Sequence, residues 1–194
     1  INNYMNYIFE IIELNKFTND LRTLYKNYFN KWVEYGGDPL TALHASTIST
    51  NEKVISDISK IFKKDIIENF KFFKVLANGE AMPHTDSRNV AINIPIFVDV
   101  RNTLSFYEDT GKSEESKLWV DGKRIKTKAQ SYPKTNVIES HNTTNSFCLN
   151  TRAIHGIATN CDKDRIILSI SMKDEYNDYD KLKQMYKTND LLRT

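Results

Sequence analysis

The chain has 194 residues, a length that fits one domain and allows a sizeable hydrophobic core. Its composition, 40% hydrophobic and 27% charged, is ordinary for a globular protein. The formal net charge of +2 indicates neither a nucleic-acid-binding nor a membrane-binding protein, and no apolar run approaches the length of a membrane span.

The two cysteines, Cys148 and Cys161, are too few for a disulfide framework, and we expect both to be small buried residues. No secretory pattern of charged and apolar regions is visible. A reducing, cytoplasmic location is therefore predicted. The sequence indicates no oligomeric state.

The first third of the chain predicts helices. Residues 7–12 form an apolar stretch that fits either an edge strand or a short helix. From Leu21 to Trp32, apolar residues recur every three or four positions, which predicts an amphipathic helix ended by Gly36-Gly37-Asp38-Pro39. A second helix is expected to begin at Ser49, with Glu52 completing a capping box.

From Phe70 onward the pattern changes to short β-type runs. Strands are predicted at 71–77, 81–86, 90–97, 103–108, 117–121, 124–129, 146–151, 154–159 and 165–172. Asp121-Gly122 predicts a two-residue hairpin turn. The polar stretches 109–117 and 130–146 predict long loops, and helical spacing returns over 174–193. This pattern favours a sandwich or barrel, of which the cupin jelly roll is one form.

The triplet His84-Thr85-Asp86 carries the strongest chemical signal. Residues two apart in a strand point to the same face, so His84 and Asp86 can present an imidazole and a carboxylate to one metal ion. His155 can complete a two-histidine, one-carboxylate face, a ligand set that suits non-haem Fe(II) with open positions. Arg165, at the start of an apolar run, can bind a carboxylate through two parallel hydrogen bonds.

The ordered set of segments resembles the Fe(II)/2-oxoglutarate-dependent dioxygenase superfamily, closest to its prolyl and aspartyl/asparaginyl hydroxylase-like branch. The resemblance covers about residues 70–172, and it is carried by segments 82–86, 91–96, 102–107, 150–158 and 165–169. It implies a double-stranded β-helix, a jelly roll of cupin type, with the N-terminal helices packed on one sheet. We expect a single domain, with helical support at 1–69, the jelly-roll core at 70–172 and a C-terminal helix at 173–194.

The same resemblance implies that His84, Asp86 and His155 are the catalytic metal ligands and that Arg165 binds the co-substrate. Fe(II), 2-oxoglutarate and O₂ would be the cofactors, and succinate and CO₂ the co-products of a hydroxylation. Many members of the superfamily carry a serine or threonine two residues after this arginine. Here that position is Ile167, so the helper of Arg165 is not identified.

Weaker candidates for co-substrate binding are Asn93, Ser169 and Tyr107. Strand parity places Ser169 on the face of Arg165. Asn93 lies between apolar neighbours and fits either an inner contact or a core hydrogen bond. Neither His44, expected in a loop between helices, nor His141, expected in a polar turn, has a partner that suggests a role.

Residues 155–159 and the run from Arg165 are expected to form a hairpin, and loop 130–146 is expected to cover the substrate. That substrate is an unidentified small molecule or protein side chain, with preference for a protein or amino-acid side chain. Two alternatives stay open. One is a non-catalytic, cupin-like metal- or carboxylate-binding module. The other is a nucleic-acid-directed oxygenase, suggested by the basic hairpin at 123–128.

Overall fold

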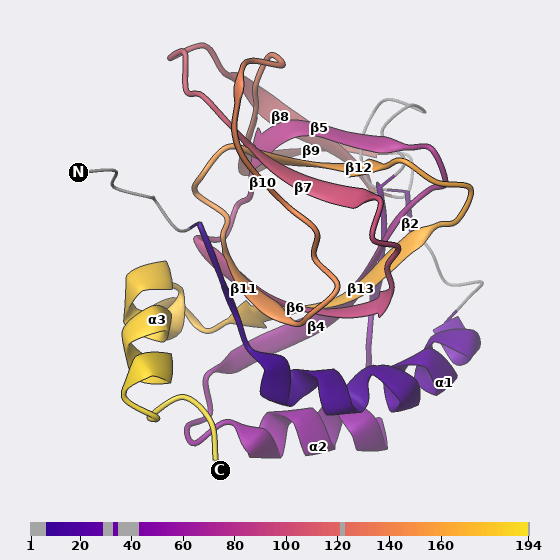
Figure 1. Cartoon of the computed structure of the whole chain (residues 1–194), viewed down its shortest axis with the longest axis vertical. Helices are drawn as coiled ribbons and strands as arrows, with labels where there is room; N and C mark the ends of the chain where they lie inside the picture. The colour runs from indigo at the N-terminus through magenta and orange to yellow at the C-terminus, as the bar shows by residue number, and fades with distance from the viewer. Residues whose placement is uncertain (1–6, 29–32, 35–42, 121–122, 194) are drawn as a thin grey trace.

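A computed structural model describes residues 7–28, 33–34, 43–120 and 123–193, with only the backbone described at 33–34, 43–46, 116–120 and 123–128 (Figure 1). Within this part of the chain, two antiparallel sheets lie face to face. The seven-stranded sheet has the order β1 (Ile8–Glu10), β11 (Phe147–Asn150), β6 (Val90–Phe97), β13 (Arg165–Met172), β4 (Ile67–Val75), β3 (Leu43–Thr47) and β2 (Val33–Glu34). The six-stranded sheet has the order β10 (Val137–His141), β7 (Asn102–Tyr107), β12 (His155–Thr159), β5 (Glu80–Thr85), β9 (Lys123–Ser131) and β8 (Glu114–Val120).

The path of the chain between the sheets is that of a jelly roll. From β4 to β7 and again from β10 to β13, successive strands alternate between the six- and the seven-stranded sheet. Each sheet thereby gains a core of four antiparallel strands, β11-β6-β13-β4 and β10-β7-β12-β5. The predicted fold class is confirmed, including the helices on one sheet. None of the described helices combines the length and apolar composition needed to cross a membrane.

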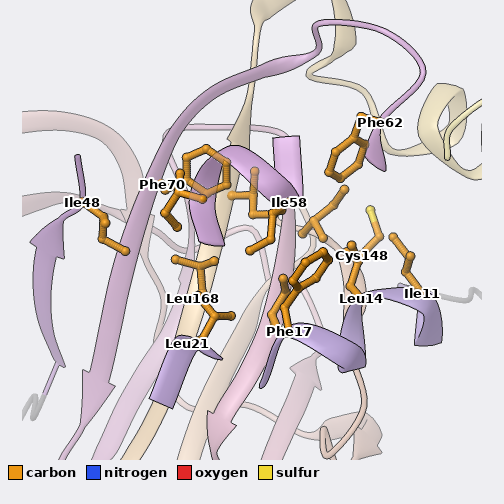
Figure 2. Packing of buried hydrophobic residues seen from close by; sticks show 14 of the residues in the cluster. Ile11, Leu14, Phe17, Leu21, Ile48, Ile58, Phe62, Phe70, Cys148 and Leu168 are labelled. Carbon is orange, nitrogen blue, oxygen red and sulfur yellow. The ribbon is translucent and has the colours of Figure 1, made fainter. Parts of the chain in front are cut away.

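The main hydrophobic core lies between the helices and the seven-stranded sheet. The helical segments are η1 (Ile12–Phe17), α1 (Thr18–Tyr28), α2 (Lys53–Ile61), η2 (Asp174–Tyr176) and α3 (Tyr179–Lys187). In Figure 1, α1 and α2 run beneath this sheet and α3 lies beside β11. Leu21 and Ile58 from the helices meet Phe70 and Leu168 from the strands in one buried cluster (Figure 2).

Strand alternation separates this core from the space between the sheets. Ile166, Leu168 and Ile170 of β13 belong to the helix-side core. Their neighbours Arg165 and Ser169 therefore point to the opposite face, towards the six-stranded sheet. We call this the inner face.

The N-terminal third contains more strand than expected. β1 settles the alternative for residues 7–12 in favour of an edge strand, followed by η1. β2 and β3 extend the sheet, so the segment containing His44 is a strand and not a loop between helices. The division into support, core and C-terminal helix as one domain stays a prediction, although residues 7–69 contribute strands as well as helices.

The predicted start of the second helix is wrong. α2 begins at Lys53, and Glu52 caps it without a side-chain hydrogen bond. The Ser49 hydroxyl instead accepts from the Asn51 N–H at 3.2 Å, and Glu52 Oε1 accepts from the Tyr28 hydroxyl at 3.2 Å. Both members of the predicted capping box are therefore engaged elsewhere.

Two connections differ from expectation. β12 and β13 form no hairpin, because β12 pairs with β5 and β7 while β13 pairs with β4 and β6. Segment 130–146 is not one open loop, since β9 reaches Ser131 and β10 occupies 137–141. The β8–β9 pairing is as predicted, with Val120 opposite Lys123; the turn at 121–122 lies outside the described residues.

Candidate metal centre

Two paired strands bring the predicted histidines together. His84 of β5 lies directly opposite His155 of β12 in the antiparallel register, and their ring centroids are 4.5 Å apart. Paired residues of antiparallel strands share a face, so both imidazoles point to the same side. Asp86 follows the end of β5, where its N–H donates to the Thr151 carbonyl at 3.1 Å. This bond holds the backbone that carries the carboxylate.

The three side chains present their donor atoms to one point. Asp86 Oδ1 lies 3.4 Å from His84 Nε2 and 3.8 Å from His155 Nε2. One donor atom from each of the three residues lies within 4.8 Å of the others. Two imidazole nitrogens and a carboxylate oxygen are a suitable ligand set for Fe(II), so the group fits a divalent metal ion.

The remaining ring nitrogens are occupied by the backbone. His84 Nδ1 lies 2.7 Å from the Met82 carbonyl, and His155 Nδ1 lies 2.9 Å from the Ala153 carbonyl. A carbonyl can only accept, so Nδ1 carries the proton in both neutral rings and Nε2 keeps its lone pair. Both histidines are therefore held in the tautomer that binds a metal through Nε2.

The pKa values agree with this arrangement. Burial alone would raise the pKa of Asp86, but the hydrogen bond with His84 and the charge of Arg88 hold it well below its usual range. Burial and the neighbouring His84 lower the pKa of His155 to about 4. Burial also acts to lower the pKa of His84, yet the hydrogen bond and charge of Asp86 raise it overall. At neutral pH, Asp86 is thus ionised and His155 neutral, as metal ligation requires.

Arg165 is a buried cation that pairs with no anion among the described residues. Its side chain is 3% exposed, and burial lowers its pKa to about 10. Among the described residues its guanidinium makes one hydrogen bond, from Nη2 to Thr143 Oγ1 at 3.3 Å, and no carboxylate pairs with it. A buried charge normally needs a partner, so this guanidinium is suited to an anionic ligand. Thr143 supplies a hydroxyl that Ile167 cannot.

Asn93 and Ser169 belong to a network centred on a residue that the sequence reasoning missed. The Ser169 hydroxyl donates to Asn93 Oδ1 at 2.6 Å and accepts from Arg88 Nη2 at 3.0 Å. Arg88 in turn donates from Nε to Asp86 Oδ2 at 3.0 Å. The two predicted co-substrate contacts therefore connect, through Arg88, to the candidate metal ligand.

The structure does not bring Tyr107 to this cluster. Phe106, the partner of His155 in β7, points inward, so Tyr107 points to the outer face. There its ring lies against Gly156: a Cβ on that glycine would be 3.2 Å from Tyr107 Cε2. His141 lies in β10 and not in a turn, and its Nε2 is 2.5 Å from Glu139 Oε1.

The residues that the sequence reasoning missed carry weak local signals. Arg88 follows the end of β5, where strand parity no longer predicts direction, and Thr143 lies in a polar connection. Both cysteines are buried and free, as expected.

Comparison with known proteins shows likeness only at the level of structure, since no family model and no curated protein matches the sequence. A Pseudomonas putida prolyl-4-hydroxylase superposes with a TM-score of 0.54 at 8% identity, over 87% of this chain and 93% of that chain. The non-haem alpha ketoglutarate-dependent carbocyclase SnoK from nogalamycin biosynthesis gives 0.53 at 9% identity, over 86% and 79%.

The epimerase SnoN, solved in complex with Fe³⁺, alpha ketoglutarate and nogalamycin RO, gives a TM-score of 0.51 at 9% identity, over 81% of this chain and 74% of that chain. At such low identity the likeness speaks for the fold. The chain thus has the jelly-roll fold of alpha ketoglutarate-dependent (2-oxoglutarate-dependent) non-haem enzymes, as the resemblance in its sequence had indicated.

Proposed function

We propose that this protein is an Fe(II)- and 2-oxoglutarate-dependent dioxygenase that hydroxylates a C–H bond. One observation carries the proposal: His84 Nε2, His155 Nε2 and Asp86 Oδ1 converge while both Nδ1 atoms are committed to carbonyls. The buried Arg165, which pairs with no carboxylate within the described part of the chain, supports the second half of the proposal, because a dicarboxylate co-substrate would supply the missing negative charge.

In this proposal, His84, Asp86 and His155 hold the metal, and Arg165 with Thr143 holds the distal carboxylate of 2-oxoglutarate. When bound, Fe(II) supplies the redox chemistry by which 2-oxoglutarate, O₂ and R–H become succinate, CO₂ and R–OH. The chain's own contribution is orientation. Nε2 of each histidine is kept free of protons, and Arg165 fixes one end of the co-substrate so that the other can reach the metal.

The substrate that we favour is a protein or amino-acid side chain. The prolyl-4-hydroxylase of the same fold motivates this choice. SnoN and SnoK, from nogalamycin biosynthesis, make a small molecule the second option. Asn69, opposite Ser171 in β4, has a buried Oδ1 with no hydrogen-bond partner within the described part of the chain. Such an acceptor suits a substrate that donates a hydrogen bond. We also propose a reducing, cytoplasmic location, consistent with Fe(II) and two free thiols.

Two other functions are the competitors. A cupin-like binding module would hold metal or carboxylate without turnover, and fold alone does not separate it from an enzyme. A nucleic-acid-directed oxygenase would use the basic hairpin at 123–128, whose side chains lie outside the described residues. The connections at 132–136 and 142–146 that flank β10 are the segments that we propose to border the substrate.

The deciding experiment is succinate formation. Purified protein with Fe(II), ascorbate and 2-oxoglutarate is incubated in air, with and without peptide and metabolite panels, and succinate and mass shifts are recorded. We expect slow uncoupled succinate production that one substrate class accelerates. Fe(II) affinity is measured in parallel for His84→Ala, Asp86→Ala and His155→Ala.

The outcomes separate the candidates. Metal binding without succinate under any condition indicates the binding module. Acceleration by oligonucleotides alone, with a gain of one oxygen atom, indicates the nucleic-acid enzyme. Wild-type Fe(II) affinity in all three alanine variants would remove the metal assignment.

A further inference from the structure

Arg88 makes three hydrogen bonds that join the two sheets. Its Nε donates to Asp86 Oδ2 at 3.0 Å, on the side of the candidate metal ligands. Its Nη1 donates to Ser171 Oγ at 2.9 Å and its Nη2 to Ser169 Oγ at 3.0 Å, both on β13 of the seven-stranded sheet. The guanidinium also lies 5.8 Å from the ring centroid of Phe73 on β4. Each nitrogen is therefore engaged, and its plane is fixed.

This arrangement distinguishes the two oxygens of Asp86. Oδ2 is the atom that accepts from Arg88, whereas Oδ1 is the atom that lies closest to His84 Nε2 and His155 Nε2. An ionised carboxylate can otherwise bind a cation through one oxygen or both. With Oδ2 committed to a charge-assisted hydrogen bond, only Oδ1 is directed to the metal position.

The backbone that carries Arg88 is held independently of its side chain. The Thr151 hydroxyl donates to the Arg88 carbonyl at 2.6 Å. Asn177 Oδ1 accepts from the N–H groups of Asn89 and Val90, at 2.9 and 3.2 Å. Both ends of the arginine are thus anchored, so it can resist movement of the carboxylate.

We propose that Arg88 is a positioning residue that restricts Asp86 to metal binding through Oδ1 alone. The inference rests on the proposed metal site and deepens it. A six-coordinate ion with three protein donor atoms keeps three positions open, enough for a chelating 2-oxo acid and O₂. A carboxylate bound through both oxygens would occupy one of these positions. The role of Arg88 is therefore to keep the third open position available.

The test counts open positions directly. Mn(II) is bound to the protein without co-substrate, and coordinated waters are counted from the broadening of its EPR lines in ¹⁷O-enriched water. We expect three waters in the wild type and two in Arg88→Met, because the released Oδ2 turns to the metal. Arg88→Lys keeps a charged donor near Oδ2 and should restore the third water. The affinity of the Mn(II) form for 2-oxoglutarate should fall at least about tenfold in Arg88→Met, about 1.4 kcal/mol.

Arg101→Met is the matched control. Arg101 makes an Asp–Arg pair of the same sequence spacing, from Nε to Asp99 Oδ1 at 2.8 Å, but its side chain is 53% exposed, against 20% for Arg88, and Asp99 is not among the candidate metal ligands. This variant should keep three waters and wild-type co-substrate affinity. Any loss shared by the two variants would be a general effect of breaking an Asp–Arg pair.

Each outcome bears on one of the two claims. If the wild type binds no Mn(II), the proposed metal site fails and this inference fails with it. If the wild type binds Mn(II) and Arg88→Met keeps three waters, the metal site stands and the role of Arg88 is refuted. Should Arg88→Met not fold, the smaller change Arg88→Gln decides by the same count, with two waters expected and three contradicting the proposal.

Discussion

His84 and His155 reach the same state by the same local means. Each ring bonds through Nδ1 to the carbonyl two residues earlier, Met82 in one case and Ala153 in the other. Because that carbonyl lies two residues before the histidine, in β5 for His84 and just before β12 for His155, the tautomer is set by the local backbone of each segment. In each neutral ring, Nε2 is therefore unprotonated before a metal binds. The pH dependence of metal affinity should then reflect only the protonation of the rings.

We expect metal affinity to decrease as the pH is lowered, because a single histidine becomes protonated. His84, whose pKa is raised by Asp86, must lose a proton to bind, whereas His155, with a pKa of about 4, is already neutral. Below the raised pKa of His84, affinity should drop about tenfold per pH unit. Mn(II) titrations over a pH series measure the slope. A slope of two protons near neutrality, or no slope, would contradict the assignment.

Replacing Arg165 by leucine should weaken 2-oxoglutarate binding while leaving metal affinity nearly unchanged. The lost charge-assisted hydrogen bonds predict a decrease on the order of 10- to 100-fold. Arg165→Lys should recover only part, since an ammonium cannot reproduce the planar fork. Thr143→Val should give a smaller loss. Anaerobic titration of the Fe(II)–2-oxoglutarate absorption band provides the affinities. Unchanged affinity in the leucine variant would place the co-substrate elsewhere.

Among the site residues, the sequence predicted those whose direction follows from alternation along a strand. His84 lies near the end of β5, Asp86 follows one position after that end, and His155 begins β12; alternation predicted a shared face for the first two, and the structure brings all three side chains together. Arg88 and Thr143 lie outside strands, where no period applies. Tyr107 differs from these two residues, because its strand was predicted. Alternation along that strand nevertheless places its side chain on the outer face, away from the candidate metal ligands.

Among the elements, β12 depends on a glycine next to the distal histidine. The register of β12 against β5 shifts between His155 and Ile157, so that Gly156 alone faces two residues of β5, Met82 and Pro83. A Cβ there would lie 2.8 Å from the Ala81 carbonyl oxygen on β5. Backbone cannot move aside cheaply, so only glycine allows the close approach that sets His155 opposite His84.

Gly156→Ala should therefore lower both stability and metal affinity. Overpacking of this kind costs about 1–3 kcal/mol, and separation of β12 from β5 would part the two imidazoles. Gly111→Ala is the control, because Gly111 has φ of 73° in an exposed loop with no neighbour within 4 Å. That variant should lose about 1 kcal/mol without changing metal affinity. Denaturant unfolding and Mn(II) titration distinguish the two effects, and equal metal affinities would refute the role of Gly156.

Local sequence patterns predicted the bounds of strands better than they predicted which strands pair with each other. The bounds of β6 and β13 were predicted to the residue, since continuous apolar runs between turn signals mark strands buried on both faces. β10 was missed because Val137 and Ile138 are half exposed and the rest of the strand is polar. The false β12–β13 hairpin shows that a short connection does not reveal whether the next strand stays in its sheet.

For the whole molecule, we expect one cooperative unfolding transition, and we expect bound metal to raise its midpoint temperature. The helices α1 and α2 share one core with the seven-stranded sheet, so they should not unfold separately. A ligand at about 100 times its Kd adds about 2.7 kcal/mol, which for this size raises Tm by roughly 5–10 °C. Calorimetry with and without Mn(II) measures the shift, and Asp86→Ala should abolish it. Two separate transitions would contradict the single domain.

The connection between β12 and β13 has a consequence for insertions and deletions. Residues 160–164 carry the chain from one sheet to the other. Two hydrogen bonds of 2.9 Å hold them to the turn between β4 and β5: the Cys161 carbonyl accepts from Asn78 N–H, and Asp164 Oδ1 accepts from Ala77 N–H. Arg165 follows His155 by ten residues, so the length of this connection helps to set the distance between the proposed metal site and the guanidinium. An insertion or deletion in this connection would therefore alter the distance that the proposed dicarboxylate has to span between the proposed metal site and Arg165.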